Sequence, residues 1–133
     1  MILVFDTSVW ISAFHYERRQ SPPILALERA RNRHVMGTCD EIEDEVCRIL
    51  TEKFDWQPAA VRYRLDFFLA RSVRVTLSGN IHVCRDPNDD VVLECAVVSG
   101  AQAIVTGDKD LLVLDPYDGI RIVTPAEFLA LTA

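Results

Sequence analysis

The sequence predicts an α/β fold, a three-layer sandwich with a mainly parallel central sheet. Short apolar runs of strand length alternate along the chain with longer segments whose apolar residues recur at helical spacing. Most of these runs are continuously apolar, which is typical of strands buried on both faces of a parallel sheet. The chain has 133 residues, of which 50% are hydrophobic, enough to fill one core. We therefore expect a single domain spanning residues 1–133.

The amino-terminal half of the chain predicts strands and helices in alternation. Ile2–Phe5 is an apolar run that stops at Asp6, and Thr7 or Ser8 can cap the helix that follows. Prolines suit the first turn of the second helix. The expected elements are a strand at 2–5, a helix at 9–14, a polar interruption at 15–20, a helix at 24–30, a strand at 34–37, an acidic helix at 40–50 and a helix at 58–69.

The carboxyl-terminal half continues the same alternation. Gly100 is expected to stop one helix, and Thr124 to Glu127 has the residues of a capping box at the start of the last one. The expected elements are a strand at 73–77, a turn at 78–80, a loop at 85–90, a helix at 91–98, a strand at 103–106, a turn at 115–119, a strand at 120–123 and a helix beginning at 124–127.

The composition also indicates in which cellular compartment the protein acts. No apolar stretch approaches the roughly 20 residues that span a bilayer, so we expect neither a membrane anchor nor a signal peptide. The four cysteines form no C-x-x-C pair, and a domain with a full core does not need disulfides. Both observations favour reduced thiols and a cytoplasmic protein.

Acidic residues follow the strands at the edge where α/β proteins bind ligands. Asp6 comes directly after the first strand, and Asp108 follows the 103–106 strand after one glycine. Ligands bind outside the carboxyl ends of such strands. Asp89 and Asp90 stand where a helix is expected to begin, and Glu45 lies inside the acidic helix. We expect these side chains to converge.

A group of carboxylates suggests a metal site. Carboxylates a few ångströms apart cannot all ionise cheaply unless a cation lies between them. Oxygen ligands suit Mg²⁺ or Mn²⁺ rather than zinc. Such ions can hold a phosphate and activate water. The formal charge of −6 argues only weakly against a nucleic-acid substrate, because many of the acids belong to the segments expected to form this site.

Three segments contain these acids: VFDTSVWISA, CDEIEDEVCRIL and CRDPNDDVVLECAVVSGAQAIVTGDKDLL. They resemble the PIN-domain family of nucleases, which includes toxins of bacterial toxin–antitoxin pairs. The resemblance implies four catalytic acids, Asp6, Glu45, Asp90 and Asp108. It implies metal ligation by Asp6, Glu45, Asp89, Asp90, Asp108 and Asp110, with Ser8 and Thr106 in support. Asp89 and Asp90 remain alternatives for the third acid. Glu94, four residues after Asp90, either joins the site or is a solvated acid.

The resemblance also implies an activity and partners. We expect a Mg²⁺- or Mn²⁺-dependent endoribonuclease that cleaves RNA phosphodiester bonds, acting as the toxin of a pair, with an antitoxin protein and a homodimer as expected partners. One alternative is a phosphatase of the haloacid-dehalogenase type, although Ser8 stands where that class needs a second Asp. Another is a non-catalytic module that binds RNA or a partner.

An antitoxin would need a surface on which to dock. An Arg or Lys of the partner could enter the acidic site, replacing the charge of the metal. The helices at 9–14 and 24–30 are the expected docking face, because Trp10, Phe14 and Tyr16 exceed what so short a helix needs for packing. The alternative is that these aromatic residues are ordinary core or a homodimer seam.

Overall fold

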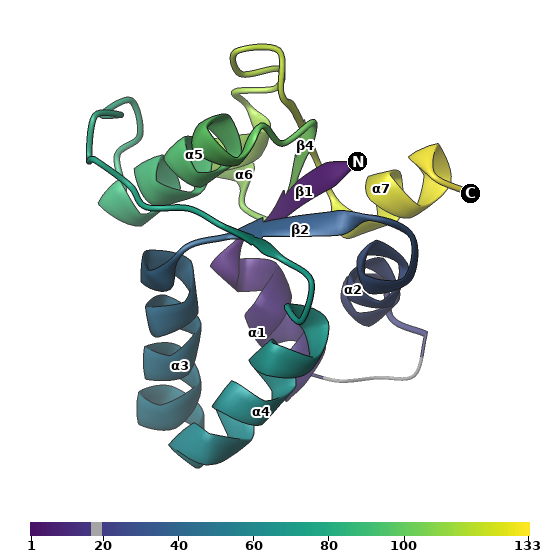
Figure 1. Ribbon diagram of the computed structural model, residues 1–133, viewed down its shortest axis with the longest axis vertical. Helices are drawn as coiled ribbons and strands as arrows, with labels where there is room; N and C mark the ends of the chain where they lie inside the picture. The colour runs from purple at the N-terminus through teal and green to yellow at the C-terminus, as the bar shows by residue number, and fades with distance from the viewer. Residues whose placement is uncertain (17–19) are drawn as a thin grey trace.

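The computed structural model describes residues 1–16 and 20–133 and contains a five-stranded parallel sheet (Figure 1). Its spatial order is β3-β2-β1-β4-β5, and each neighbouring pair is parallel. The strands are β1 (Ile2–Phe5), β2 (Val35–Thr38), β3 (Val73–Arg74), β4 (Ala103–Val105) and β5 (Arg121–Val123). The predicted α/β class is confirmed, and the sheet is parallel throughout the described strands.

Helices cover both faces of this sheet, which gives the expected three layers. Helix α5 packs against β1, β2 and β4, whereas α1, α3 and α4 pack together on the opposite side (Figure 1). Helix α2 lies between α1 and α7. The helices are α1 (Thr7–His15), α2 (Pro22–Arg33), α3 (Asp40–Phe54), α4 (Pro58–Phe68), α5 (Pro87–Ser99), α6 (Lys109–Leu112) and α7 (Pro125–Leu131).

Several element boundaries differ from the predicted ones. Strand β3 has two residues instead of five, and both are exposed. Helix α3 runs four residues further than expected, to Phe54, where Asp55 adopts a left-handed conformation (φ 58°). The polar interruption at 15–20 includes residues 17–19, which lie outside the described residues. The sequence did not reveal the short helix α6.

Helix α5 begins four residues earlier than expected. The Asp86 side chain accepts a hydrogen bond from the Asn88 N–H at 2.9 Å, and Pro87 occupies the first helical position. Residues assigned to a loop are therefore helical, so Asp89 and Asp90 lie in the first turn and project in different directions. This boundary decides which of the two can reach the site.

The expected docking face on the early helices is corrected by the burial of its side chains. Trp10 is 3% exposed and Phe14 is 2% exposed. Their rings lie 5.6 Å apart, and each lies 6.0 Å from the ring of Phe68 on α4. These two residues are ordinary core. The third aromatic residue of the expected face, Tyr16, is 59% exposed and lies on the surface.

Helix α5 approaches β2 very closely at Gly37. A Cβ on this residue would lie 2.7 Å from Ser99 Oγ and 2.9 Å from Ser99 Cβ. Real Cβ atoms do not approach other heavy atoms so closely, so the absence of a side chain at Gly37 sets the spacing between α5 and the sheet. The contact lies at the carboxyl end of α5, where it fixes how closely this helix packs on the sheet.

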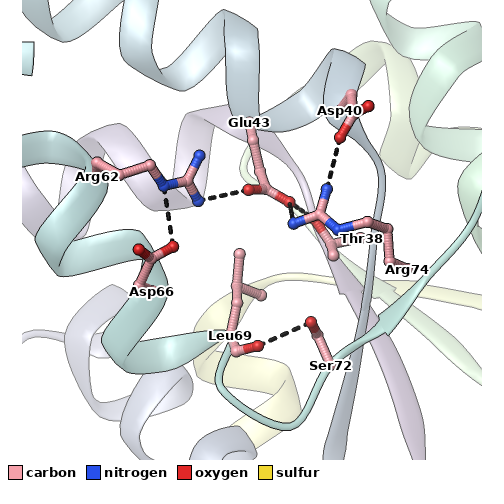
Figure 2. Close-up of polar contacts among 8 residues, drawn as sticks. All are labelled: Thr38, Asp40, Glu43, Arg62, Asp66, Leu69, Ser72 and Arg74. Carbon is pink, nitrogen blue, oxygen red and sulfur yellow. Dashed lines mark hydrogen bonds and ion pairs between the residues drawn. The ribbon is translucent and has the colours of Figure 1, made fainter.

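A buried acid joins α3 to α4 and β3 (Figure 2). Glu43 on α3 accepts a hydrogen bond from Thr38 Oγ1 at 2.7 Å and forms ion pairs with Arg62 at 2.6 Å and Arg74 at 2.8 Å. Burial alone would raise the pKa of Glu43, but the hydrogen bonds from Arg62, Thr38 and Arg74 hold it below its usual value. The carboxylate therefore stays charged and links α3 to β2, α4 and β3.

Two further features concern the cysteines and the apolar character of the helices. All four cysteines are free. Across residues 1–16 and 20–133, none of the helices combines the length and the apolar character needed to cross a membrane.

Candidate metal-binding site

Asp6 lies at the carboxyl end of β1, where it is fixed by side chains from two elements. Its Oδ2 accepts hydrogen bonds from Ser8 Oγ at 2.8 Å and from Thr106 Oγ1 at 2.7 Å. Burial raises the pKa of Asp6, and the charge of Asp108 adds to this effect, while the two hydroxyl hydrogen bonds lower it. Both bonds use Oδ2, so neither of them occupies Oδ1.

Asp108 follows β4 and is coupled to Asp6 through Thr106. The Thr106 hydroxyl donates to Asp6 and accepts a hydrogen bond from the Asp108 N–H at 2.9 Å. Asp108 is also the N-cap of α6, where its Oδ1 accepts from the Asp110 N–H at 2.9 Å. One buried hydroxyl therefore holds the two strand-end acids in a fixed relation.

Asp89 faces this pair from the first turn of α5. Asp89 is only 5% exposed. Burial raises the pKa of Asp89 to about 7, and the negative charges of Asp108, Asp6 and Asp86 contribute in the same direction. A carboxylate surrounded by three other acids is the arrangement expected of a site that holds a cation.

Asp90, expected to converge with these acids, lies elsewhere. Its Oδ1 accepts hydrogen bonds from the N–H groups of Val83 and Cys84, both at 2.9 Å. Burial would raise the pKa of Asp90, yet these N–H donors hold it below its usual value. The helix places Asp90 about 100° from Asp89 around its axis, so the carboxylate secures the preceding loop instead of facing Asp6.

Glu94 is also a loop anchor, which corrects both expectations for it. It is 5% exposed, so it is not a solvated acid. Its carboxylate accepts from the N–H groups of Ser78, Gly79 and Asn80 at 2.6 to 3.3 Å. Since it lies four residues after Asp90, the two acids share one face of α5 and together bind the 78–84 loop.

A cleft of about 460 Å³ joins the remaining acids. Asp6, Asp89 and Asp108 line one part of it, and Glu45 reaches it from α3. Glu43, two residues earlier, is committed to Arg62 and Arg74 instead (Figure 2). The structure therefore brings Glu45, and not Glu43, to the acidic cleft.

The donor set fits a hard divalent cation. Carboxylate oxygens of Asp89, Asp108 and Asp110 lie within 4.8 Å of one another. Asp110 is ion-paired with Arg85, which is 3.0 Å from Oδ1. Oxygen ligands from carboxylates are those that Mg²⁺ and Mn²⁺ prefer. Burial is the largest cause of the raised pKa values of Asp6 and Asp89, and the charges of neighbouring acids add to it; a divalent cation held here would offset both.

Sequence reasoning missed several residues that line the cleft. They include Arg48 and Lys53 of α3 and Tyr16, which follows the end of α1. Asn88 was missed as well, whereas Asp86, which also lines the cleft, belongs to the acidic segments expected to form the site. The two cations could have been found from spacing alone, because positions three and eight residues after Glu45 share its side of a helix.

The fold and the acids define an α/β protein with a carboxylate site at the carboxyl edge of a parallel sheet. The chain matches the PIN domain family over residues 2–110. This match covers most of the chain, so the protein belongs to the PIN domain family.

Two solved structures share this fold. One is VapBC2 from Rickettsia felis, described as bound to a DNA fragment from its promoter. It is 14% identical, with 92% of this chain and 97% of that chain covered and a TM-score of 0.63. The other is VapC20 from Mycobacterium tuberculosis, a toxin described as cleaving the sarcin-ricin loop. It is 16% identical, with 90% and 98% covered and a TM-score of 0.57. No curated protein sequence matches the chain.

Proposed function

We propose that this protein is a metal-dependent endoribonuclease, with residues 1–133 forming one PIN-like nuclease domain. The observation that carries the proposal is the meeting of Asp6, Glu45, Asp89 and Asp108 around one cleft at the ends of β1 and β4. Membership of the PIN domain family supports it independently. Hydrolysis of a phosphodiester needs negative charge to be neutralised and water to be activated, and this acid group suits both tasks.

The ligand set follows from the donor positions. Asp89, Asp108 and Asp110 would hold Mg²⁺ or Mn²⁺, with Asp6 beside them. The bound ion would neutralise charge on the scissile phosphate and activate the attacking water. Asp89 takes the role of third acid, and Asp90 does not, because its carboxylate is engaged by the Val83 and Cys84 N–H groups.

The other side chains orient the ligands and move protons. Ser8 and Thr106 donate to Asp6 and fix the direction of its carboxylate. Glu45 faces the same cleft from α3, outside the group of three close carboxylates. It can accept a proton from the attacking water, or complete the metal coordination from the opposite wall.

We further propose that the enzyme is the toxin of a toxin–antitoxin pair and acts in the cytoplasm. The structural neighbours support this proposal, because one is VapBC2 bound to a DNA fragment from its promoter and the other, VapC20, is described as a toxin. The partners would be an RNA substrate, a cognate antitoxin protein and a second copy of the chain in a homodimer. An Arg or Lys of the antitoxin would restrain the enzyme by occupying the acidic cleft.

A cleavage assay tests the enzymatic proposal. Purified protein is incubated with RNA in Mg²⁺, in Mn²⁺ and with EDTA, beside the Asp6→Asn variant. We expect cleavage by the wild type with metal only, and none by Asp6→Asn. Metal-independent cleavage, or full activity of Asp6→Asn, would refute the proposed site. Hydrolysis of p-nitrophenyl phosphate without RNA cleavage would instead support a phosphatase.

A growth experiment tests the toxin proposal. Expression of the wild type should slow a bacterial host, Asp6→Asn should not, and co-expression of the neighbouring open reading frame should restore growth. Equal toxicity of the wild type and Asp6→Asn would overturn the toxin proposal. Absence of both cleavage and toxicity would favour a non-catalytic binding module.

A further inference from the structure

The cleft has two chemically different ends. The acids around Asp6 lie where α1 begins, whereas Tyr16 and Lys53 line the cleft where α1 and α3 end, and Arg48 lies on α3 between Glu45 and Lys53. Arg48 and Lys53 lie on α3 in the same helix as Glu45, three and eight residues further on. A helix rises 1.5 Å per residue, so the two cations stand about 4.5 Å and about 12 Å along the axis from Glu45. Positive charge therefore extends along the α3 wall of the cleft from the acid site.

Both cations are available to a ligand. Arg48 lies 3.5 Å from Glu52 in an ion pair whose side chains are 52% and 65% exposed. Exposed pairs of this kind contribute little to stability, so the guanidinium can exchange Glu52 for a phosphate at small cost. Lys53 is exposed at the carboxyl end of α3. An Arg and a Lys beside a phosphate-cleaving site match the charge of an RNA backbone.

An aromatic cluster stands at the same end. Phe54 stacks on His15 with ring centroids 3.8 Å apart, and Tyr16 meets Phe54 edge-on at 6.1 Å. Both Phe54 and Tyr16 line the cleft. The Tyr16 residue is nevertheless 59% exposed. Tyr16 also meets the His15 ring at a centroid distance of 4.7 Å, so two ring contacts hold it in place while more than half of the residue stays exposed. An exposed aromatic ring held in this way is a platform on which a base can stack.

The groove on the other side of Asp108 lacks these features. It has a volume of about 560 Å³ and is lined mainly by prolines and small residues, such as Pro22, Pro23 and Pro125. Among the described residues that line it, Asp108 is the single charged one. The phosphates beside the scissile one are therefore attracted toward α3 and not toward this groove.

Resting on the proposed nuclease function, we propose that the α3 end of the cleft binds single-stranded RNA adjacent to the cleavage point. Arg48 and Lys53 hold backbone phosphates, and Tyr16 stacks on an unpaired base. A base in a duplex is already stacked and cannot be offered to Tyr16, so the site selects unpaired RNA. These residues position the substrate and take no part in the chemical step.

Binding to uncleaved RNA tests this directly. In an Asp6→Asn background, fluorescence anisotropy measures the affinity for a labelled single-stranded RNA and for a hairpin duplex over a range of salt. Arg48→Gln and Lys53→Gln should each weaken binding to the single strand. Each should also lower the slope of log affinity against log salt by about 0.7, the value for one lost phosphate contact on a single strand.

Tyr16→Ala should behave differently. It should weaken single-strand binding roughly tenfold, because a stacked base is lost, while the salt slope stays unchanged. Tyr16→Phe keeps the ring and should bind like the parent. Arg33→Gln on α2 and Tyr63→Ala on α4 are matched controls, since they make the same chemical changes outside the cleft.

The outcomes separate this inference from the proposed function. If the wild type cleaves RNA and Asp6→Asn does not, but the three cleft variants bind like their controls, the inference fails and the nuclease proposal stands. If the wild type never cleaves but the cleft variants lose affinity as described, the nuclease proposal fails and the binding site stands. Equal affinity for the duplex and the single strand overturns the selection of unpaired RNA. Melting curves of each variant establish that it is folded.

Discussion

Asp89 and Asp90 are neighbours in the sequence but serve different parts of the molecule. Asp89 lies in the acidic cleft with Asp6 and Asp108, whereas Asp90 accepts hydrogen bonds from the loop backbone at Val83 and Cys84. Their pKa values move in opposite directions, upward for Asp89 and downward for Asp90. The first is surrounded by negative charge and the second by N–H donors. Substitution should therefore affect activity in one case and stability in the other.

Asp89→Asn should abolish metal-dependent RNA cleavage without destabilising the metal-free protein. The change removes a ligand charge and also relieves repulsion from Asp6 and Asp108. Asp90→Asn should instead lower the free energy of unfolding by about 1–3 kcal/mol, because the Val83 and Cys84 N–H groups lose a charged acceptor. Cleavage rates and denaturant melts of the two variants measure the difference. A catalytically dead, fully stable Asp90→Asn would show that the two roles are reversed.

Stability of the metal-free protein should respond to pH through Asp89. In the unfolded chain its pKa is about 4, and in the folded protein it is about 7. Between these values the folded form binds more protons, so the contribution of Asp89 to stability falls as pH rises from 4 to 7. Melts of the wild type and Asp89→Asn should show the variant gaining relative stability across this window. A constant difference would contradict the raised pKa.

Metal binding should show the reverse dependence on pH. Protonation of Asp89 competes with the cation, so Mn²⁺ should raise the melting temperature more at pH 8 than at pH 6. Mg²⁺ should act in the same direction. The same titration on Asp89→Asn should give a much smaller shift at both pH values. A shift that is independent of pH, or unchanged by the substitution, would mean that Asp89 is not a ligand.

Glu43→Gln should destabilise the protein without removing the acid site. Gln cannot carry the charge that pairs with Arg62 and Arg74, and the loss should be about 1–3 kcal/mol. The lowered pKa of Glu43 stabilises the fold above its unfolded pKa, and this contribution is lost as pH falls through the folded pKa. The variant should therefore lose less of its remaining stability on acidification than the wild type does. Asp44→Asn, an exposed neighbour on α3, is the control and should leave both quantities nearly unchanged.

Gly37→Ala should force α5 away from the sheet. The new methyl group would meet Ser99 at 2.7 and 2.9 Å, and such overpacking typically costs about 1–3 kcal/mol. Gly107→Ala is the matched change, because its Cβ would come no closer than 4.0 Å to Ser8 Oγ. Chemical denaturation compares the two. A Gly37→Ala protein as stable as Gly107→Ala would show that α5 can move freely at this point.

Local sequence patterns were sufficient for the α/β class and for most elements. β1 and β4 are continuous apolar runs, because a strand covered on both faces has no side that faces water. This feature is visible in the strand's own residues. The acids that end these runs, Asp6 and Asp108, were located for the same reason, since strand ends fix where the ligand edge lies. The order and spacing of residues in the sequence therefore located those whose position depends only on their own strand or helix.

The tertiary structure decided which way individual side chains point. Whether Asp89 or Asp90 faces the cleft depends on the start of α5, which the Asp86 cap sets four residues before the expected position. The burial of Trp10 depends on where Phe68 of α4 packs against α1, whereas Tyr16 contacts Phe54 of α3 and stays exposed. A one-residue change in position turns a helical side chain by about 100°. Sequence patterns place a helix boundary with an error of a residue or more, so they leave the direction of a side chain undecided. The packing of α5 against the sheet and of α4 against α1 decides it.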